Sequence, residues 1–113
     1  MKIKDIVKLC DAQLVCCEES LENEVNSACG SDMMSDVLAY VKDQAVLITG
    51  LVNSQVIRTA EMMDMRCIIF VRSKTPTDEM ITLAKESSIV VLTTKLRMYE
   101  ACGKLYQAGL GNS

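Results

Sequence analysis

From about residue 30 onward, the chain alternates between two hydrophobic patterns. Three short runs are apolar at nearly every position, namely residues 45–49 (AVLIT), 66–72 (RCIIFVR) and 89–93 (IVVLT). Runs of this length are typical of strands buried on both faces of a parallel sheet. Between them, apolar residues recur at helical spacing. The pattern therefore predicts strand–helix–strand units with right-handed crossovers and helices on both faces of the sheet.

The helix that follows Gly30 has two candidate caps, Ser31 and Asp32, and is expected to run to about Lys42. A side-chain oxygen at either position can accept a hydrogen bond from a free N–H group of the first turn. Asn53 or Ser54 is expected to cap the next helix in the same way. At helical spacing, the first of these helices turns four residues toward the core: Met33, Val37, Leu38 and Val41.

Two more helices are expected in the second half of the chain. Pro76 suits the first position of a helix, and Asp78 and Glu79 complement the positive end of that helix. The last helix is expected to run from Thr94 to about Gly109.

The first 29 residues predict a short helix over 2–10, a strand over 12–17 and a second strand over 25–29. The acidic stretch 18–24 between the strands predicts a solvated loop or a single turn. These two strands could join either edge of the sheet, and one could be antiparallel. The expected fold is therefore a three-layer α/β/α arrangement around a mostly parallel five-stranded sheet, in one domain over residues 1–113.

Composition narrows the class of protein. Half of the 113 residues are hydrophobic and 24% are charged, which is typical of globular domains. The strongly apolar runs span about five residues, far below the roughly 20 that cross a bilayer. There is also no pattern of a secretory signal. We therefore expect a cytoplasmic protein with no membrane contact.

Charge and cysteine usage exclude further classes. The net charge is −3, the basic residues are scattered, and the chain has no Trp, so nucleic acid is not an expected partner. The six cysteines form no CxxC pair and the chain has no His, so neither a metal site nor a cofactor is expected. Four cysteines lie within apolar runs, as reduced core thiols do in a reducing compartment.

Candidate chemistry gathers in the loops that follow the predicted strands, because ligands of open α/β sheets bind beyond the carboxyl ends of the strands. Arg72, Lys74 and Lys95 would bring three cations to helix N-termini, which favour anions. An anionic small ligand is one hypothesis for this edge. The alternative is that these residues only cap helices and solvate the surface, since neither GxxxxGK[ST] nor GxGxxG is present. The candidate ligand-binding residues are Ser31, Asp32, Thr49, Asn53, Arg72, Lys74, Thr93, Thr94 and Lys95.

Catalysis has one weak candidate, the Cys29 thiol. Its predicted position at a helix N-terminus would lower its pKa, but Asp32 opposes that shift. Without any His, the chain cannot form a Cys–His or Ser–His pair. A packing role is favoured for Cys29, and no catalytic residue is expected.

Eight methionines include the adjacent pairs Met33-Met34 and Met62-Met63. A helix buries only one of two neighbours, so Met34 and either Met62 or Met63 are candidates for exposure. Exposed Met is typical of partner surfaces, whereas buried Met fills irregular cores, and both interpretations remain open.

Three stretches resemble the DRTGG domain family: ACGSDMMSDVLAYV, QAVLITGLVNSQVIRTAEMMDMRCIIFVRS and VVLTTKLRMYEACGKL. Gly30, Asp32 and Asp36 match the motif, and only Thr49-Gly50 remains of its Thr-Gly-Gly part. Met33 stands where the family commonly has Arg. The family is similar in fold to the N-terminal domain of HPr kinase/phosphatase, whose kinase P-loop lies in another domain and is absent here.

The resemblance implies a regulatory or interaction module that tends to dimerise and has no established chemistry. Our leading hypothesis is a non-catalytic homodimer that docks on a partner protein not identified by the sequence. The alternative is a sensor of an anionic metabolite or nucleotide at Arg72, Lys74 and Lys95. An enzyme that uses Cys29 is a third, disfavoured hypothesis.

Overall fold

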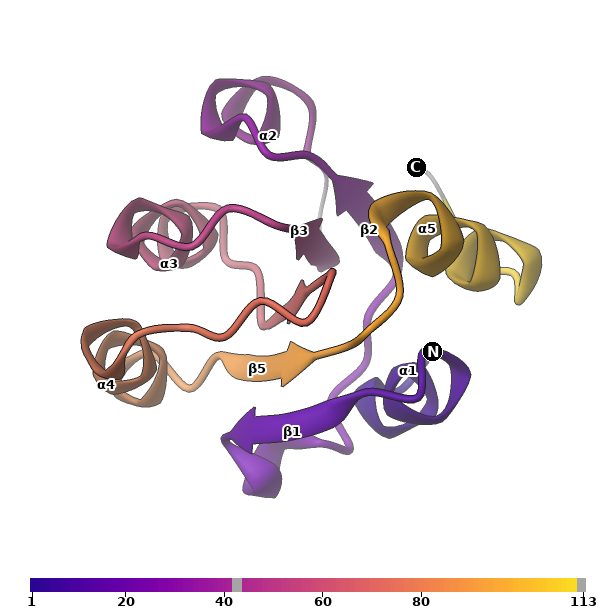
Figure 1. Ribbon diagram of the computed structural model, residues 1–113, viewed down its shortest axis with the longest axis horizontal. Coiled ribbons are helices and arrows are strands. Elements are labelled where there is room, and N and C mark those ends of the chain that lie inside the picture. The colour runs from indigo at the N-terminus through magenta and orange to yellow at the C-terminus, as the bar shows by residue number, and fades with distance from the viewer. Residues whose placement is uncertain (42–43, 112–113) are drawn as a thin grey trace.

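A five-stranded mixed sheet forms the centre of the molecule (Figure 1). The computed structural model describes residues 1–41 and 44–111. The strand order is β1-β5-β4-β3-β2, and the strands span Gln13–Cys16 (β1), Ser27–Gly30 (β2), Ala45–Thr49 (β3), Cys67–Phe70 (β4) and Val90–Thr93 (β5). β2, β3, β4 and β5 pair in parallel, whereas β1 pairs antiparallel to β5. The two N-terminal strands, whose places the sequence left open, therefore lie at opposite edges.

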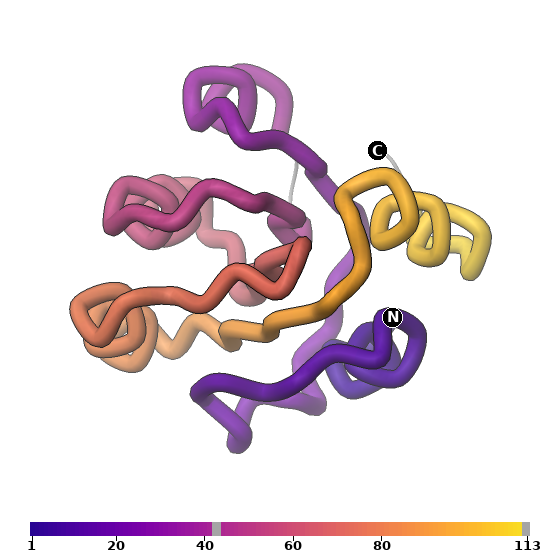
Figure 2. Tube along the Cα trace, in the orientation of Figure 1, coloured from indigo at the N-terminus to yellow at the C-terminus, as the bar shows by residue number. Residues whose placement is uncertain are grey.

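Helices cover both faces of the sheet, which confirms the predicted fold class. α2 (Met34–Tyr40), α3 (Ser54–Met62) and α4 (Asp78–Glu86) cover one face, and α1 (Ile3–Leu9) and α5 (Met98–Gln107) cover the other (Figure 1). The first and last helices of the chain lie side by side, as Figure 2 shows. A short 3-10 helix, Glu18–Ser20, occupies the acidic stretch after β1.

The central strands β3 and β4 are almost entirely apolar because helices cover both faces of the sheet. Every residue of β3 and of β4 is buried, because helices pack on both faces and strands flank both edges. A polar side chain at any position of these two strands would lose its hydration. The strands are therefore apolar at consecutive positions instead of at every second one. Phe70, at the end of β4, is among the largest fully buried side chains.

The expected face of α2 is wrong by one residue at its start. Met33 is 60% exposed, while Met34 is only 9% exposed and packs in the core. The helix begins at Met34, with Met33 still extended, so its buried stripe starts one residue later than expected. Leu38 is consequently exposed rather than buried. The helix ends at Tyr40, and Lys42 lies outside the described residues.

Two other helix starts also differ from expectation. Pro76 precedes α4 instead of opening it, because Thr77 is the cap and its Oγ1 accepts a hydrogen bond of 3.2 Å from the Met80 N–H. α5 begins at Met98 rather than Thr94. The residues between β5 and α5 instead bond to the loop after β4. The Thr94 carbonyl accepts a hydrogen bond from the Ser73 N–H, and the Leu96 carbonyl accepts one from the Arg72 N–H.

Within residues 1–41 and 44–111, no helix combines the length and the apolar character that crossing a membrane requires.

Candidate functional site

The register of the sheet aligns the carboxyl ends of the parallel strands. Thr49 of β3 pairs with Phe70 of β4, and Phe70 pairs with Thr93 of β5. Gln13, the first residue of the antiparallel β1, pairs with Thr93. Four loops therefore lie together beyond the carboxyl ends of the parallel strands: those that follow β3, β4 and β5, and the one that precedes β1. The sequence predicted this edge for the loops after the parallel strands.

Asp32 is the centre of a hydrogen-bonded cluster at this edge. Its Oδ1 accepts a hydrogen bond of 3.1 Å from the Thr49 hydroxyl and one of 2.7 Å from the Gly50 N–H. Thr49 Oγ1 in turn accepts a hydrogen bond of 3.1 Å from the Leu51 N–H. The carboxylate thus fixes the loop after β3. Neither Asp32 nor Ser31 caps α2, whose cap position is Met33 without a side-chain hydrogen bond, so both expected caps of that helix are wrong.

Arg72 closes this cluster from the loop after β4. Its Nη2 lies 3.7 Å from Asp32 Oδ2, and both side chains are about half exposed. The guanidinium also covers Gly50, where an added Cβ would lie 2.9 Å from Arg72 Cζ. A side chain at position 50 would therefore displace the guanidinium from its place over the loop. Arg72 and Ser73 both have left-handed backbone conformations, with φ of 60° and 57°, which non-glycine residues adopt at a cost.

A cavity of about 320 Å³ lies at the same edge of the sheet. Three candidate residues line it, Thr93, Thr94 and Lys95, together with Ser73 and Thr75 from the loop after β4. Thr94 is buried, and its hydroxyl donates a hydrogen bond of 2.7 Å to the Cys10 carbonyl. Thr94 therefore anchors the cavity wall rather than offering a free hydroxyl to a ligand.

The structure thus brings six of the nine candidate residues together in two places. Asp32, Thr49 and Arg72 form the cluster, and Thr93, Thr94 and Lys95 line the cavity. Arg72 faces Asp32, and Lys74 is exposed and is not among the residues that line the cavity, so the three expected cations do not line one pocket.

The remaining candidates have local roles. Asn53 caps α3 as expected, since its Oδ1 accepts a hydrogen bond of 2.9 Å from the Gln55 N–H. Ser31 Oγ accepts one of 3.0 Å from the Met33 N–H, before α2 begins.

The sequence analysis did not identify Asp11, in the turn before β1, or Gln13, the first residue of β1, and both line the cavity. They reach this edge because β1 runs antiparallel to β5, which places the start of β1 beside the ends of the other strands. No local signal in residues 11–13 reveals that direction. Asp11 thus adds an acidic residue to the lining that also contains Lys95.

The thiols are not arranged for nucleophilic chemistry. Cys29 lies within β2 and not at a helix N-terminus, which corrects its expected position. Burial, the Cys102 thiol and the Asp36 carboxylate all raise the pKa of Cys29. Burial also raises the pKa of Cys102. Thiolates are the reactive form, so both groups are less reactive than an ordinary exposed cysteine.

The cysteines within apolar runs behave as predicted. Cys10, Cys16, Cys17 and Cys67 are buried and free. In the part of the chain that the structure describes, no three His, Cys, Asp or Glu side chains lie close enough together to hold a metal ion.

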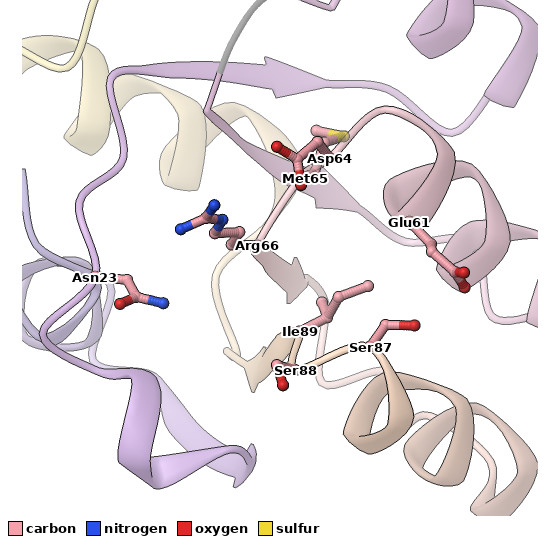
Figure 3. Close-up of a pocket in the computed structure, with 8 residues that line it drawn as sticks. All are labelled: Asn23, Glu61, Asp64, Met65, Arg66, Ser87, Ser88 and Ile89. Atoms are coloured by element: carbon pink, nitrogen blue, oxygen red, sulfur yellow. The ribbon is translucent and has the colours of Figure 1, made fainter.

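A second cavity, of about 310 Å³, lies among the loops that follow α3 and α4, away from all nine candidate residues (Figure 3). Glu61 and Asp64 line it, and Arg66 extends toward Asn23. The carbonyl ends of α3 and α4 lie nearby and carry partial negative charge. This cavity is therefore a poor place for an anionic ligand.

The fold defines an α/β domain. In the loops beyond the carboxyl ends of its strands, the polar residues of the Asp32 cluster form hydrogen bonds and an ion pair with one another. A sequence profile described as the DRTGG domain matches residues 5–108. The chain therefore belongs to the DRTGG domain family, which confirms the resemblance seen in the sequence.

A solved structure has the same fold. It is described as the crystal structure of the CBS and DRTGG domains of the regulatory region of Clostridium perfringens pyrophosphatase complexed with activator, diadenosine tetraphosphate. The TM-score is 0.74 at 19% sequence identity, over 95% of this chain and 46% of that chain. The chain thus spans about half the length of that structure. No curated protein matches the chain.

Proposed function

We propose that this chain is a non-catalytic regulatory module that acts as a homodimer and docks on a partner protein. The observation that carries this proposal is the Asp32 cluster. The polar groups that the family motif supplies, Asp32, Thr49 and Gly50, are bonded to one another and to Arg72. These residues hold two loops in a fixed shape, and their polar groups bond to one another, which supports a structural role for them over a role as base or nucleophile.

Other observations support the same function. The DRTGG domain of the clostridial structure is part of a regulatory region, and this chain shares its fold. Residues 1–113 would act as one unit. The six free cysteines suit a reducing compartment, so we assign the module to the cytoplasm.

A second candidate function is a sensor of an anionic metabolite or nucleotide. The 320 Å³ cavity favours it, because Lys95 lines this cavity together with the hydroxyl residues Ser73 and Thr75. The regulatory region of the clostridial enzyme is complexed with a nucleotide activator, which is such a ligand. Asp11 weighs against this function, since its carboxylate lines the same cavity.

Thermal denaturation in the presence of candidate ligands distinguishes the interaction module from the sensor. The panel contains several nucleotides, sugar phosphates and acyl phosphates, including diadenosine tetraphosphate, each at about 1 mM. A ligand present at 100 times its Kd stabilises the folded state by about 2.7 kcal/mol, which raises Tm by several degrees. An interaction module leaves Tm unchanged across the panel.

A rise in Tm that Lys95→Ala removes would instead establish the sensor. The matched control is Lys85→Ala on α4, which removes an exposed lysine that does not line the cavity.

A further inference from the structure

The outward face of α5 carries two large apolar side chains that nothing in the described chain covers. Tyr99 is 89% exposed and Tyr106 is 68% exposed. Residues seven apart lie two turns apart on the same side of a helix. In Figure 1, α5 lies at the outside of the molecule, with no other element beyond it. A soluble domain rarely leaves such a stripe open to water unless another surface covers it.

Gly103 lies between the two tyrosines, in the middle of α5. Glycine is a poor helix former because it loses the most backbone freedom on folding. Nothing within the described chain requires it, since an added Cβ would meet no heavy atom within 4 Å. By contrast, a Cβ at Gly30 would lie 2.6 Å from Cys102 Sγ, so close packing within the chain explains the glycine at position 30. Gly103 is explained if a second surface approaches the helix closely there.

The shape of this face suits the side chain of another helix. Tyr99, Cys102, Gly103 and Tyr106 occupy positions i, i+3, i+4 and i+7, and four residues at these positions form the hole that receives one side chain of a packed helix. A shallow, open depression on this face, called the groove below, is lined by these four residues. Tyr99 and Tyr106 lie at the two ends of this set, and Gly103 adds no side chain between them, so a partner helix can approach closely there.

The charges on this face are complementary to the same face of a second copy. Glu100 and Lys104 also line the groove. In an antiparallel helix pair the order of residues is reversed, so Glu100 faces Lys104 of the second copy and Tyr99 faces Tyr106 of the second copy. The two pairings have nearly the same midpoint, at Cys102 and Gly103. A single two-fold axis therefore satisfies both, as a symmetric dimer requires.

We propose that the homodimer forms through α5, packed antiparallel against α5 of a second copy about a two-fold axis at Cys102 and Gly103. This inference rests on the homodimer of the proposed function and names its interface. A parallel pair would place Glu100 opposite Glu100 and Lys104 opposite Lys104, which the like charges oppose.

Sedimentation equilibrium of charge-reversal variants tests the interface. Glu100→Lys places two lysines opposite two, and Lys104→Glu places two glutamates opposite two. Each variant alone is expected to raise the dimer Kd about tenfold or more, as like charges across an interface do. An equimolar mixture of the two variants restores opposite charges at every contact, so dimers should return. Glu61→Lys on α3 is the control, since it makes the same charge change on the other face of the sheet.

Gly103→Leu tests the close approach independently of charge. The new side chain has free space within its own chain and favours the helix more than glycine does, so the variant should fold. It fills the hole, and the dimer Kd should again rise about tenfold or more.

The possible results separate the two proposals. A wild-type dimer that is weakened by each charge reversal, restored by mixing and weakened by Gly103→Leu supports the α5 interface. A wild-type dimer that none of these variants weakens would overturn this interface and leave the homodimer of the proposed function intact. A wild-type chain that stays monomeric would overturn both.

Discussion

Asp32 Oδ1 accepts a hydrogen bond of 2.7 Å from the backbone N–H of Gly50, and this bond joins the loop after β2 to the end of β3. The same oxygen accepts the Thr49 hydroxyl at 3.1 Å. The two surviving parts of the family motif, 18 residues apart in the chain, are therefore in direct contact.

Asp32→Ala removes both bonds, and we expect the free energy of unfolding to fall by about 1–2 kcal/mol, as for hydrogen bonds to a partly exposed carboxylate. Asp32→Asn keeps an acceptor oxygen and should lose less, because the half-exposed ion pair with Arg72 contributes little. Urea denaturation of both variants checks this. Equal losses in Ala and Asn would mean that charge, and not the hydrogen bonds, holds the loop.

Gly50 and Arg72 should be coupled energetically. Gly50→Ala leaves the backbone conformation acceptable but displaces the guanidinium, whose Cζ lies 2.9 Å from the site of the new Cβ. Arg72→Ala removes the same guanidinium. In a double-mutant cycle, the double variant should therefore lose clearly less stability than the sum of the single variants. Additive losses would show that Arg72 does not rest on Gly50 in solution.

Thr59, buried in α3, has a hydroxyl with no hydrogen-bond partner among the described residues. Thr59→Val replaces this hydroxyl with a methyl group of similar size, so we expect the free energy of unfolding to rise by about 1 kcal/mol. Thr59→Ser is the matched control: it keeps the unpaired hydroxyl, loses a methyl group and should be less stable than wild type. A Val variant that is less stable than wild type would indicate that the hydroxyl is bonded after all.

The buried thiols predict a loss of stability at high pH. Burial raises the pKa of Cys67, and burial and the neighbouring Cys16 thiol raise the pKa of Cys17 to about 12. A raised pKa means that the folded state holds its proton more tightly than the unfolded chain. The contribution is complete below the unfolded thiol pKa of about 8.5 and is lost as pH rises toward the folded value.

The free energy of unfolding should therefore decline above about pH 9, by up to roughly 1.4 kcal/mol per pH unit for each thiol. Denaturation curves between about pH 8 and 11 should be less steeply pH-dependent for Cys67→Ala than for wild type. Identical slopes would show that Cys67 ionises as easily in the folded state as in the unfolded one.

The sequence predicted the parallel core well because burial on both faces leaves a direct pattern. The runs that contain β3, β4 and β5 are apolar at nearly every position, and the structure buries nearly every residue of the three strands. The start of α2 was wrong because Met33 and Met34 are both apolar, so hydrophobicity alone does not choose between them. The choice depends on Asp32, whose side chain bonds to β3 rather than to the helix.

The candidate site was predicted less completely, because its contacts depend on strand order. That Asp32 meets Thr49 follows only once β2 is placed beside β3 in register. Asp11 and Gln13 join the cavity only because β1 is antiparallel at the far edge. The pairing of Arg72 with Asp32, in place of a position in the cavity lined by Lys95, could not be predicted either, since Arg72 has a left-handed backbone conformation.

The central claim, a module that works as a homodimer, is tested most directly by the mass of the wild-type chain at sedimentation equilibrium over a range of micromolar concentrations. The account predicts a mass approaching twice the 12.5 kDa of one chain as concentration rises. A mass that stays at 12.5 kDa up to high micromolar concentration would contradict it.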